Sequence, residues 1–199
     1  MRFMRPAMLF AAAATFSLAS TALAAGPASL TFTDPAKDNV SPTAAGDITG
    51  VTFATSGPGT GKAYAPKHLV VTLALSAAPG TDGTTQYQVG WSISGCEYYM
   101  QYAPGAKVSP DFGFAECGSD PDATGDTGTS FGFAVQPKGN SLVFKVLVKD
   151  LPNKVKPGMT FDGLNAWADF VEPAGFFGPA SFTGPLYDVA ATTKTYKLG

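Results

Sequence analysis

The fold prediction rests on residues 86–117, QYQVGWSISGCEYYMQYAPGAKVSPDFGFAEC. The first part of this stretch alternates large apolar side chains with small or polar ones, the apolar set being Tyr87, Val89, Trp91 and Ile93. A period of two is typical of a β-strand that turns one face into a core. A second extended run follows at 97–102, and after the Pro104-Gly105 turn a third lies at 112–116. The stretch therefore predicts neighbouring antiparallel strands.

Both cysteines of the chain, Cys96 and Cys117, bracket the hairpin formed by the second and third runs. In an exported chain two cysteines are expected to pair. A bridge between them closes a loop of about 20 residues and stabilises the fold by about 3 kcal/mol. Metal or redox chemistry is the weaker interpretation, because there is no CxxC spacing and the single histidine, His68, is distant in sequence.

Outward from this stretch, period-two patterns predict further strands at 29–33, 48–53, 68–76, 131–135, 141–149, 161–171 and 187–198. No apolar period of 3.6 lasts three turns after residue 24. We therefore expect an all-β fold, one domain over residues 25–199. Its predicted form is a two-sheet antiparallel β-sandwich, immunoglobulin-like or jelly-roll-like, of about eight or nine strands, with a barrel as the alternative.

Residues 1–24 have the features of a signal peptide rather than of the folded domain. Arg2 and Arg5 precede an apolar segment, and Ala22-Leu23-Ala24 supplies small residues for cleavage. The two arginines are not adjacent and no cysteine follows the cleavage site, so neither a twin-arginine route nor a lipid anchor is expected. The prediction is a secreted or periplasmic bacterial protein with a Sec-type signal.

The charge balance excludes several classes of partner. Both arginines lie in the signal segment, so the rest of the chain has 11 lysines against 15 carboxylates, and cleavage changes the net charge from −2 to −4. Nucleic acids and anionic lipid surfaces are therefore not expected as partners. No later apolar run is long enough to span a bilayer, and we expect a monomer.

The sequence contains no motif that is characteristic of a known class of catalytic site. The sequence has no GxSxG elbow, and Ser92 lies inside a strand pattern, so a serine triad that uses His68 is not favoured. Two carboxylates about 5 to 10 Å apart suffice for glycoside hydrolysis, and Glu97 and Glu116 lie on strands expected to face each other. Solvated surface carboxylates are the simpler interpretation for this pair, and equally for Asp169 and Glu172, so we do not predict an enzyme.

Two oxygen-rich groups are candidates for a structural calcium ion. In the loop that contains Asp120, Asp122 and Asp126, oxygen ligands alternate as they do in a calcium loop, although Thr124 and Phe131 occupy positions where a stronger oxygen ligand is expected. A solvated acidic turn is the alternative there. The second group consists of Asp34, Asp38, Asn39 and Asp47.

Aromatic residues outside the core pattern are candidates for ligand binding. On a strand, Tyr98 and Tyr99 must point to opposite faces, and Gln101 shares the face of Tyr99. Trp167 likewise lies opposite an inward row of smaller residues. Because a sugar ring stacks on an aromatic face while amides bond its hydroxyls, the candidate ligand-binding residues are Tyr99, Gln101 and Trp167.

The order of several motifs resembles the DOMON-like and family 9 carbohydrate-binding-like modules of secreted bacterial proteins. These motifs are FTDPAKD at 32–38, DITGV at 47–51, Glu97-Tyr98 at the hairpin, the strand at 142–148, and Asp188-Val189-Ala190 before a closing Tyr196. The resemblance implies a β-sandwich that binds sugars, or haem in some relatives, with a structural calcium ion in some. Haem ligation of that kind uses methionine and histidine, here Met100 and His68.

The expected function is therefore that of an exported, non-catalytic binding module for carbohydrate. A structural or protein-interaction protein of the cell envelope is the alternative. A hydrolase with paired carboxylates ranks third.

Overall fold

A computed structural model describes residues 29–38, 43–56, 67–105, 112–118, 128–170 and 186–199. Strands make up most of these residues, and two short 3-10 turns, Ala44–Gly46 and Val148–Asp150, are the helical elements among them. In the described ranges no helix has the length and apolar character needed to cross a membrane. The predicted signal segment, 1–24, lies outside the described residues.

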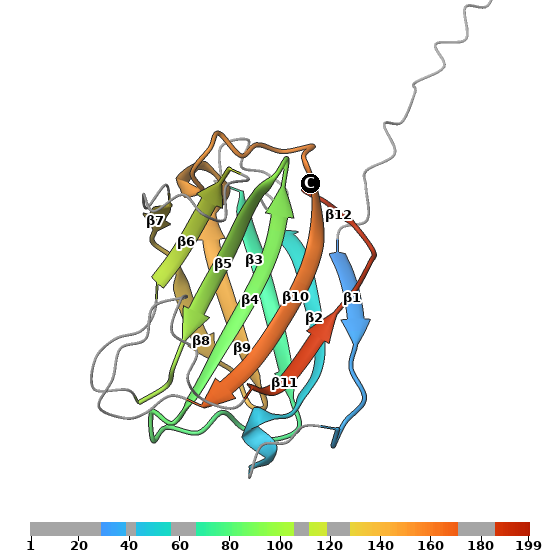
Figure 1. Cartoon of the computed structure of the whole chain (residues 1–199), viewed down its shortest axis with the longest axis vertical. Coiled ribbons are helices and arrows are strands. Elements are labelled where there is room, and N and C mark those ends of the chain that lie inside the picture. The colour runs from blue at the N-terminus through green and yellow to red at the C-terminus, as the bar shows by residue number, and fades with distance from the viewer. Residues whose placement is uncertain (1–28, 39–42, 57–66, 106–111, 119–127, 171–185) are drawn as a thin grey trace, which may run out of the picture.

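The strands form two antiparallel sheets that pack face to face (Figure 1). The five-stranded sheet has the order β1 (Ser29–Thr33), β2 (Ile48–Ser56), β3 (His68–Leu75), β9 (Ser141–Leu147) and β8 (Ala134–Pro137). The seven-stranded sheet has the order β11 (Leu186–Ala191), β10 (Thr160–Phe170), β4 (Thr85–Ile93), β5 (Cys96–Tyr102), β6 (Phe112–Cys117) and β7 (Thr129–Phe131), with β12 (Tyr196–Lys197) also paired to β10. The all-β, two-sheet sandwich predicted from the sequence is confirmed.

The described residues contain twelve strands, more than the eight or nine predicted. One reason is that the pattern at 131–135 is not a single strand: β7 ends at Phe131 in one sheet and β8 begins at Ala134 in the other. The chain therefore crosses between the sheets at Gly132 and Phe133. Alternation continues through such a crossing, because residues of both strands still pack on the same core.

The hydrophobic core lies between the sheets and is built from the alternating residues of each strand. Trp91 of β4 is its centre: its ring stacks on Tyr98 at a centroid distance of 5.7 Å and on Phe161 at 5.9 Å, and Phe53 of the opposite sheet meets it edge-on at 6.3 Å. Each such buried side chain stabilises the fold by roughly 1.5–3 kcal/mol. The prediction that Tyr98 and Tyr99 point to opposite faces is confirmed: Tyr98 is buried in the core and Tyr99 lies on the other side of the sheet.

The predicted disulfide is also confirmed. Cys96 of β5 lies directly opposite Cys117 of β6 in the strand register, and the two Sγ atoms are bonded at 2.04 Å. The bridge closes the hairpin at the end where β4 also turns into β5. It therefore fixes the register of β5 against β6.

Candidate functional site

One candidate site lies on the side of the seven-stranded sheet that is turned away from the core. Because Tyr87, Val89 and Trp91 of β4 point inward, the residues between them must point outward. The strand register extends this assignment to β5 and β10. We call these residues the outward face: Gln86, Gln88, Gly90, Tyr99, Gln101, Asn165, Trp167 and Asp169.

The register brings the three predicted ligand-binding residues together. Trp167 of β10 is opposite Gln88 of β4, which in turn is opposite Gln101 of β5. In the next row, Asn165 is opposite Gly90, and Gly90 is opposite Tyr99. Strands in a sheet are about 4.8 Å apart, so each row spans about 10 Å across three strands. An aromatic ring, amides and a phenol thus share one face.

Several polar side chains of the outward face are buried, which is unusual for residues that do not belong to the core. Gln88 is 2% exposed and Asp169 is 4% exposed. The Gln88 Oε1, Asn165 Oδ1 and Asp169 Oδ1 atoms are buried without a hydrogen-bond partner. Nδ2 of Asn165 donates to the Gly163 carbonyl at 2.8 Å, which fixes the amide orientation and leaves Oδ1 as the open group. All three open atoms are acceptors.

The Asn165 side chain occupies the space that a side chain at position 90 would fill. A Cβ atom at position 90 would lie 2.6 Å from the Asn165 Oδ1 atom and 3.3 Å from its Cγ atom. Real Cβ atoms do not approach other atoms this closely, so any side chain at 90 would displace Asn165. The absence of a side chain here lets the Asn165 amide lie close to the backbone of β4 at Gly90.

Electrostatics distinguish the outward face from the rest of the surface. Burial raises the pKa of the Asp169 carboxyl to about 7. The strands β4, β5, β6, β7, β10 and β11 contain no lysine, arginine or histidine, and β12 contributes only Lys197. A negatively charged ligand would therefore find no cation on these strands near Asp169.

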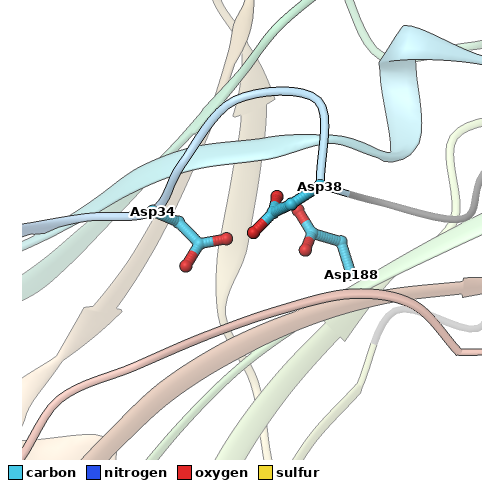
Figure 2. Close-up of side chains that lie close together, drawn as sticks. All are labelled: Asp34, Asp38 and Asp188. Atoms are coloured by element: carbon cyan, nitrogen blue, oxygen red, sulfur yellow. The ribbon is translucent and has the colours of Figure 1, made fainter.

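A second candidate site is a group of three carboxylates, Asp34, Asp38 and Asp188 (Figure 2). Their oxygen atoms lie within 4.8 Å of one another. Asp34 and Asp38 come from the loop after β1, and Asp188 comes from β11, so the group joins edge strands of the two sheets. Asp188 accepts backbone hydrogen bonds from Ile48 at 2.5 Å and from Val189 at 2.9 Å.

The carboxylates repel one another in the absence of a cation. Burial, together with the charges of Asp188, Asp38 and Asp47, raises the pKa of Asp34 to about 6. The Asp34 Oδ2 atom is buried without a hydrogen-bond partner. Asp47 has a different role, because it accepts from the Lys37 backbone and from the Ser76 hydroxyl.

The calcium ion implied by the resemblance fits this group. Three hard oxygen donors converge, and the open Oδ2 atom of Asp34 supplies the kind of ligand that calcium prefers. Asp34, Asp38 and Asp188 would hold the ion, which would supply positive charge between the sheets. Asn39 and the other predicted calcium loop, with Asp120, Asp122 and Asp126, lie outside the described residues.

The structure does not support a catalytic pair at Glu97 and Glu116 or a haem-ligand pair at His68 and Met100. Glu97 and Glu116 are opposite each other across β5 and β6, but both side chains are exposed, so neither is held as an acid in an apolar pocket. Met100 is fully buried in the core, whereas His68 lies on the outer side of the five-stranded sheet. These two residues do not form a haem-ligand pair. Glu172 lies outside the described residues.

Sequence reasoning missed Gln88, Asn165 and the contact of Asp188 with Asp34. Gln88 was visible only as a polar residue between apolar ones. The pairing of β10 with β4 joins residues 70 or more positions apart, and no local pattern reports such a pairing. In the sequence, Asp188 stands out only as part of the motif Asp188-Val189-Ala190, which does not indicate that it lies near Asp34.

Comparisons of the chain with protein-family models, with curated proteins and with solved structures found no match. The assignment of a function therefore depends on the geometry of the two candidate sites.

Proposed function

We propose that this protein is a non-catalytic binding module that holds a carbohydrate on the outward face of its seven-stranded sheet. The observation that carries the proposal is the pair of half-buried rings, Trp167 on β10 and Tyr99 on β5, which share one face of the sheet with the half-buried Asn165 amide. A sugar ring presents an apolar C–H face and a rim of hydroxyl groups. An indole ring beside amide groups offers a matching apolar surface and hydrogen-bonding groups.

The second row of the outward face supports the same ligand class. The Tyr99 ring packs against Phe114 of β6 with a centroid distance of 5.5 Å, which holds it in place beside Gly90. On the other side of Gly90, the open Asn165 Oδ1 atom can accept a hydrogen bond from a hydroxyl group. Each of the two rows thus combines an aromatic ring with at least one amide group.

The surface of the described residues favours a small polar ligand over a protein partner. Stable protein interfaces have a buried apolar centre. In the described part of the chain, Val189 is the exposed large hydrophobic residue, at 43%. A single exposed valine does not form an apolar patch of the size that protein docking sites have.

Isothermal titration of the chain from residue 25 onward against a panel of neutral oligosaccharides and polysaccharides tests the proposal. We expect at least one member to bind, and Trp167→Ala to weaken binding by about tenfold or more, because stacking on an aromatic ring is lost. Trp167→Phe, which keeps a ring, should retain part of the affinity.

Thr72→Ala, on the outer side of the five-stranded sheet, is the control and should bind as the wild type does. Thermal unfolding of each variant checks that it is folded. Unchanged binding by a folded Trp167→Ala variant, or no binding to any glycan in the panel, contradicts the proposal.

A further inference from the structure

Asp169 is the most unusual group on the outward face. Asp169 is 4% exposed, and its Oδ1 atom has no hydrogen-bond partner. A buried carboxylate normally has a cation or several donors beside it, because an unpaired buried charge is strongly unfavourable. The ionised form of Asp169 therefore lacks a compensating partner among the described residues.

The neighbours of Asp169 within the described residues do not compensate its charge. Across β4 its partner is Gln86, and two residues along β10 on the same face is Trp167. From β11 the titratable neighbour is Tyr187, whose pKa is raised by burial and by the charges of Asp169 and Asp82. The one basic residue of this sheet's strands, Lys197, pairs with Thr160 at the other end of β10, about 30 Å along the strand.

We propose that the outward face selects a carbohydrate with a positively charged amino group, and that Asp169 receives this ammonium group. This inference rests on the proposed function, since it names the class of sugar for the same site. The neighbouring open acceptors, Gln88 Oε1 and Asn165 Oδ1, would receive the hydroxyl groups of the same sugar. All three positions require donors, and an amino sugar carries an ammonium group together with several free hydroxyl groups.

A metal ion is a poorer occupant at Asp169 than an ammonium group. Calcium needs six to eight oxygen ligands. Among the described residues, the carboxylates that come close enough to share an ion are Asp34, Asp38 and Asp188, and Asp169 is not with them. Amide and indole groups beside a single carboxylate are suited to an organic cation, for which one charge-assisted hydrogen bond and an aromatic neighbour suffice.

Anionic sugars should be rejected at this site. The outward side of β4, β5, β6 and β10 carries the carboxylates Glu97, Glu116, Asp162 and Asp169 and no basic side chain. A uronate or sulfate group would be desolvated beside Asp169 without a counter-charge, which is unfavourable for both groups.

The test is titration calorimetry at pH 7 with three oligosaccharides of equal length: one of glucosamine, its N-acetylated counterpart and a neutral glucose oligomer. The wild type should bind the glucosamine oligomer at least about tenfold more tightly than either neutral one, the size expected for one charge-assisted hydrogen bond. Asp169→Asn should lose this preference, so that its affinity for the glucosamine oligomer is no greater than its affinity for the neutral ones. Glu97→Gln removes an exposed carboxylate from the same sheet face and should keep the preference.

Proton release provides a readout that a purely structural role would not change. Because the pKa of free Asp169 is about 7, the carboxyl is partly protonated at pH 7, and an ammonium partner favours its ionised form. When Asp169 ionises on binding, its proton goes to the buffer or to a sugar amine that is not yet protonated. The wild type and Asp169→Asn should therefore differ in how the binding enthalpy depends on the ionisation enthalpy of the buffer. The contribution from Asp169 should be absent in Asp169→Asn.

The outcomes separate the two proposals. Equal binding of charged and neutral sugars overturns the role of Asp169 and leaves the carbohydrate proposal intact. A preference for glucosamine that persists in Asp169→Asn also overturns it, because another group would then bind the amine. No binding of any sugar overturns both. The inference is supported if Asp169→Asn loses both the preference for glucosamine and the proton exchange with the buffer, and Glu97→Gln keeps both.

Discussion

Replacing Asp169 by asparagine should change how the stability of the protein depends on pH. The carboxyl has an ordinary pKa of 3.8 and a pKa of about 7 in the folded protein, because burial disfavours its charged form. The folded state therefore binds the proton more tightly than the unfolded state. Stability falls as pH rises from about 4 to about 7 and levels off above that, when both states are ionised.

The magnitude follows from the two pKa values. At about 1.4 kcal/mol for each factor of ten in acidity, the full penalty above pH 7 is about 4 kcal/mol. Between pH 5 and pH 8 the free energy of unfolding of the wild type should fall by about 2.5 kcal/mol relative to that of Asp169→Asn, because part of the penalty is already present at pH 5. Asparagine has nearly the same shape and does not titrate.

Urea unfolding of both proteins at half-unit steps from pH 5 to pH 8.5 measures this difference. Other groups with raised pKa values, such as Asp34, contribute equally to both proteins and cancel in the comparison. Parallel stability curves for the two proteins would refute the reasoning, since they would mean that Asp169 is solvated or paired in the folded state.

Three further predictions concern the second row of the outward face, the carboxylate group and the disulfide. Gly90→Ala should leave the protein folded but weaken glycan binding by about tenfold, because the new Cβ displaces Asn165, whereas Gly132→Ala, whose Cβ meets no atom within 4 Å, should bind normally in the same titration. Calcium added to chelator-treated protein should raise its melting temperature, with a stabilisation of about 2.7 kcal/mol at a hundredfold excess over Kd. Asp38→Asn should reduce this stabilisation, whereas the control Asp162→Asn should not. A melting temperature that does not respond to calcium would contradict a calcium site at Asp34, Asp38 and Asp188. Replacing Cys96 and Cys117 together by serine should lower the free energy of unfolding by about 3 kcal/mol in urea titrations, and an unchanged value would show that the bridge contributes nothing to stability.

The sequence was sufficient for the local features of the fold. Alternation at 86–94 assigns each residue of β4 to a face, and the paired cysteines give the neighbour of β5. Period two does not show which distant strand lies next to β4, so the position of Trp167 beside Gln88 could not be predicted. The pattern at 131–135 likewise gave no sign that the chain changes sheets there, because inward residues in either sheet look alike in sequence.

In the candidate sites, too, local features could be predicted from the sequence and contacts between distant segments could not. The outward position of Tyr99 and Trp167 follows from local alternation, but the burial of Gln88 and Asp169 depends on the tertiary fold. The aspartates at 34 and 38 are four residues apart and were recognisable as a pair of oxygen donors. Asp188, which completes the group, is 150 residues away and reaches it because β11 lies at the edge of the opposite sheet.

The most direct test of the outward face as a binding surface uses the two tryptophans of the chain. Trp91 is buried in the core, and Trp167 is on the outward face, so their indole N–H signals in a ¹H–¹⁵N NMR spectrum report on the two sides of the same sheet. On titration with the tightest-binding glycan, the Trp167 signal should shift to saturation while the Trp91 signal stays nearly fixed. A glycan that shifts residues around His68 and Lys145 on the other sheet and leaves Trp167 unmoved would contradict the assignment.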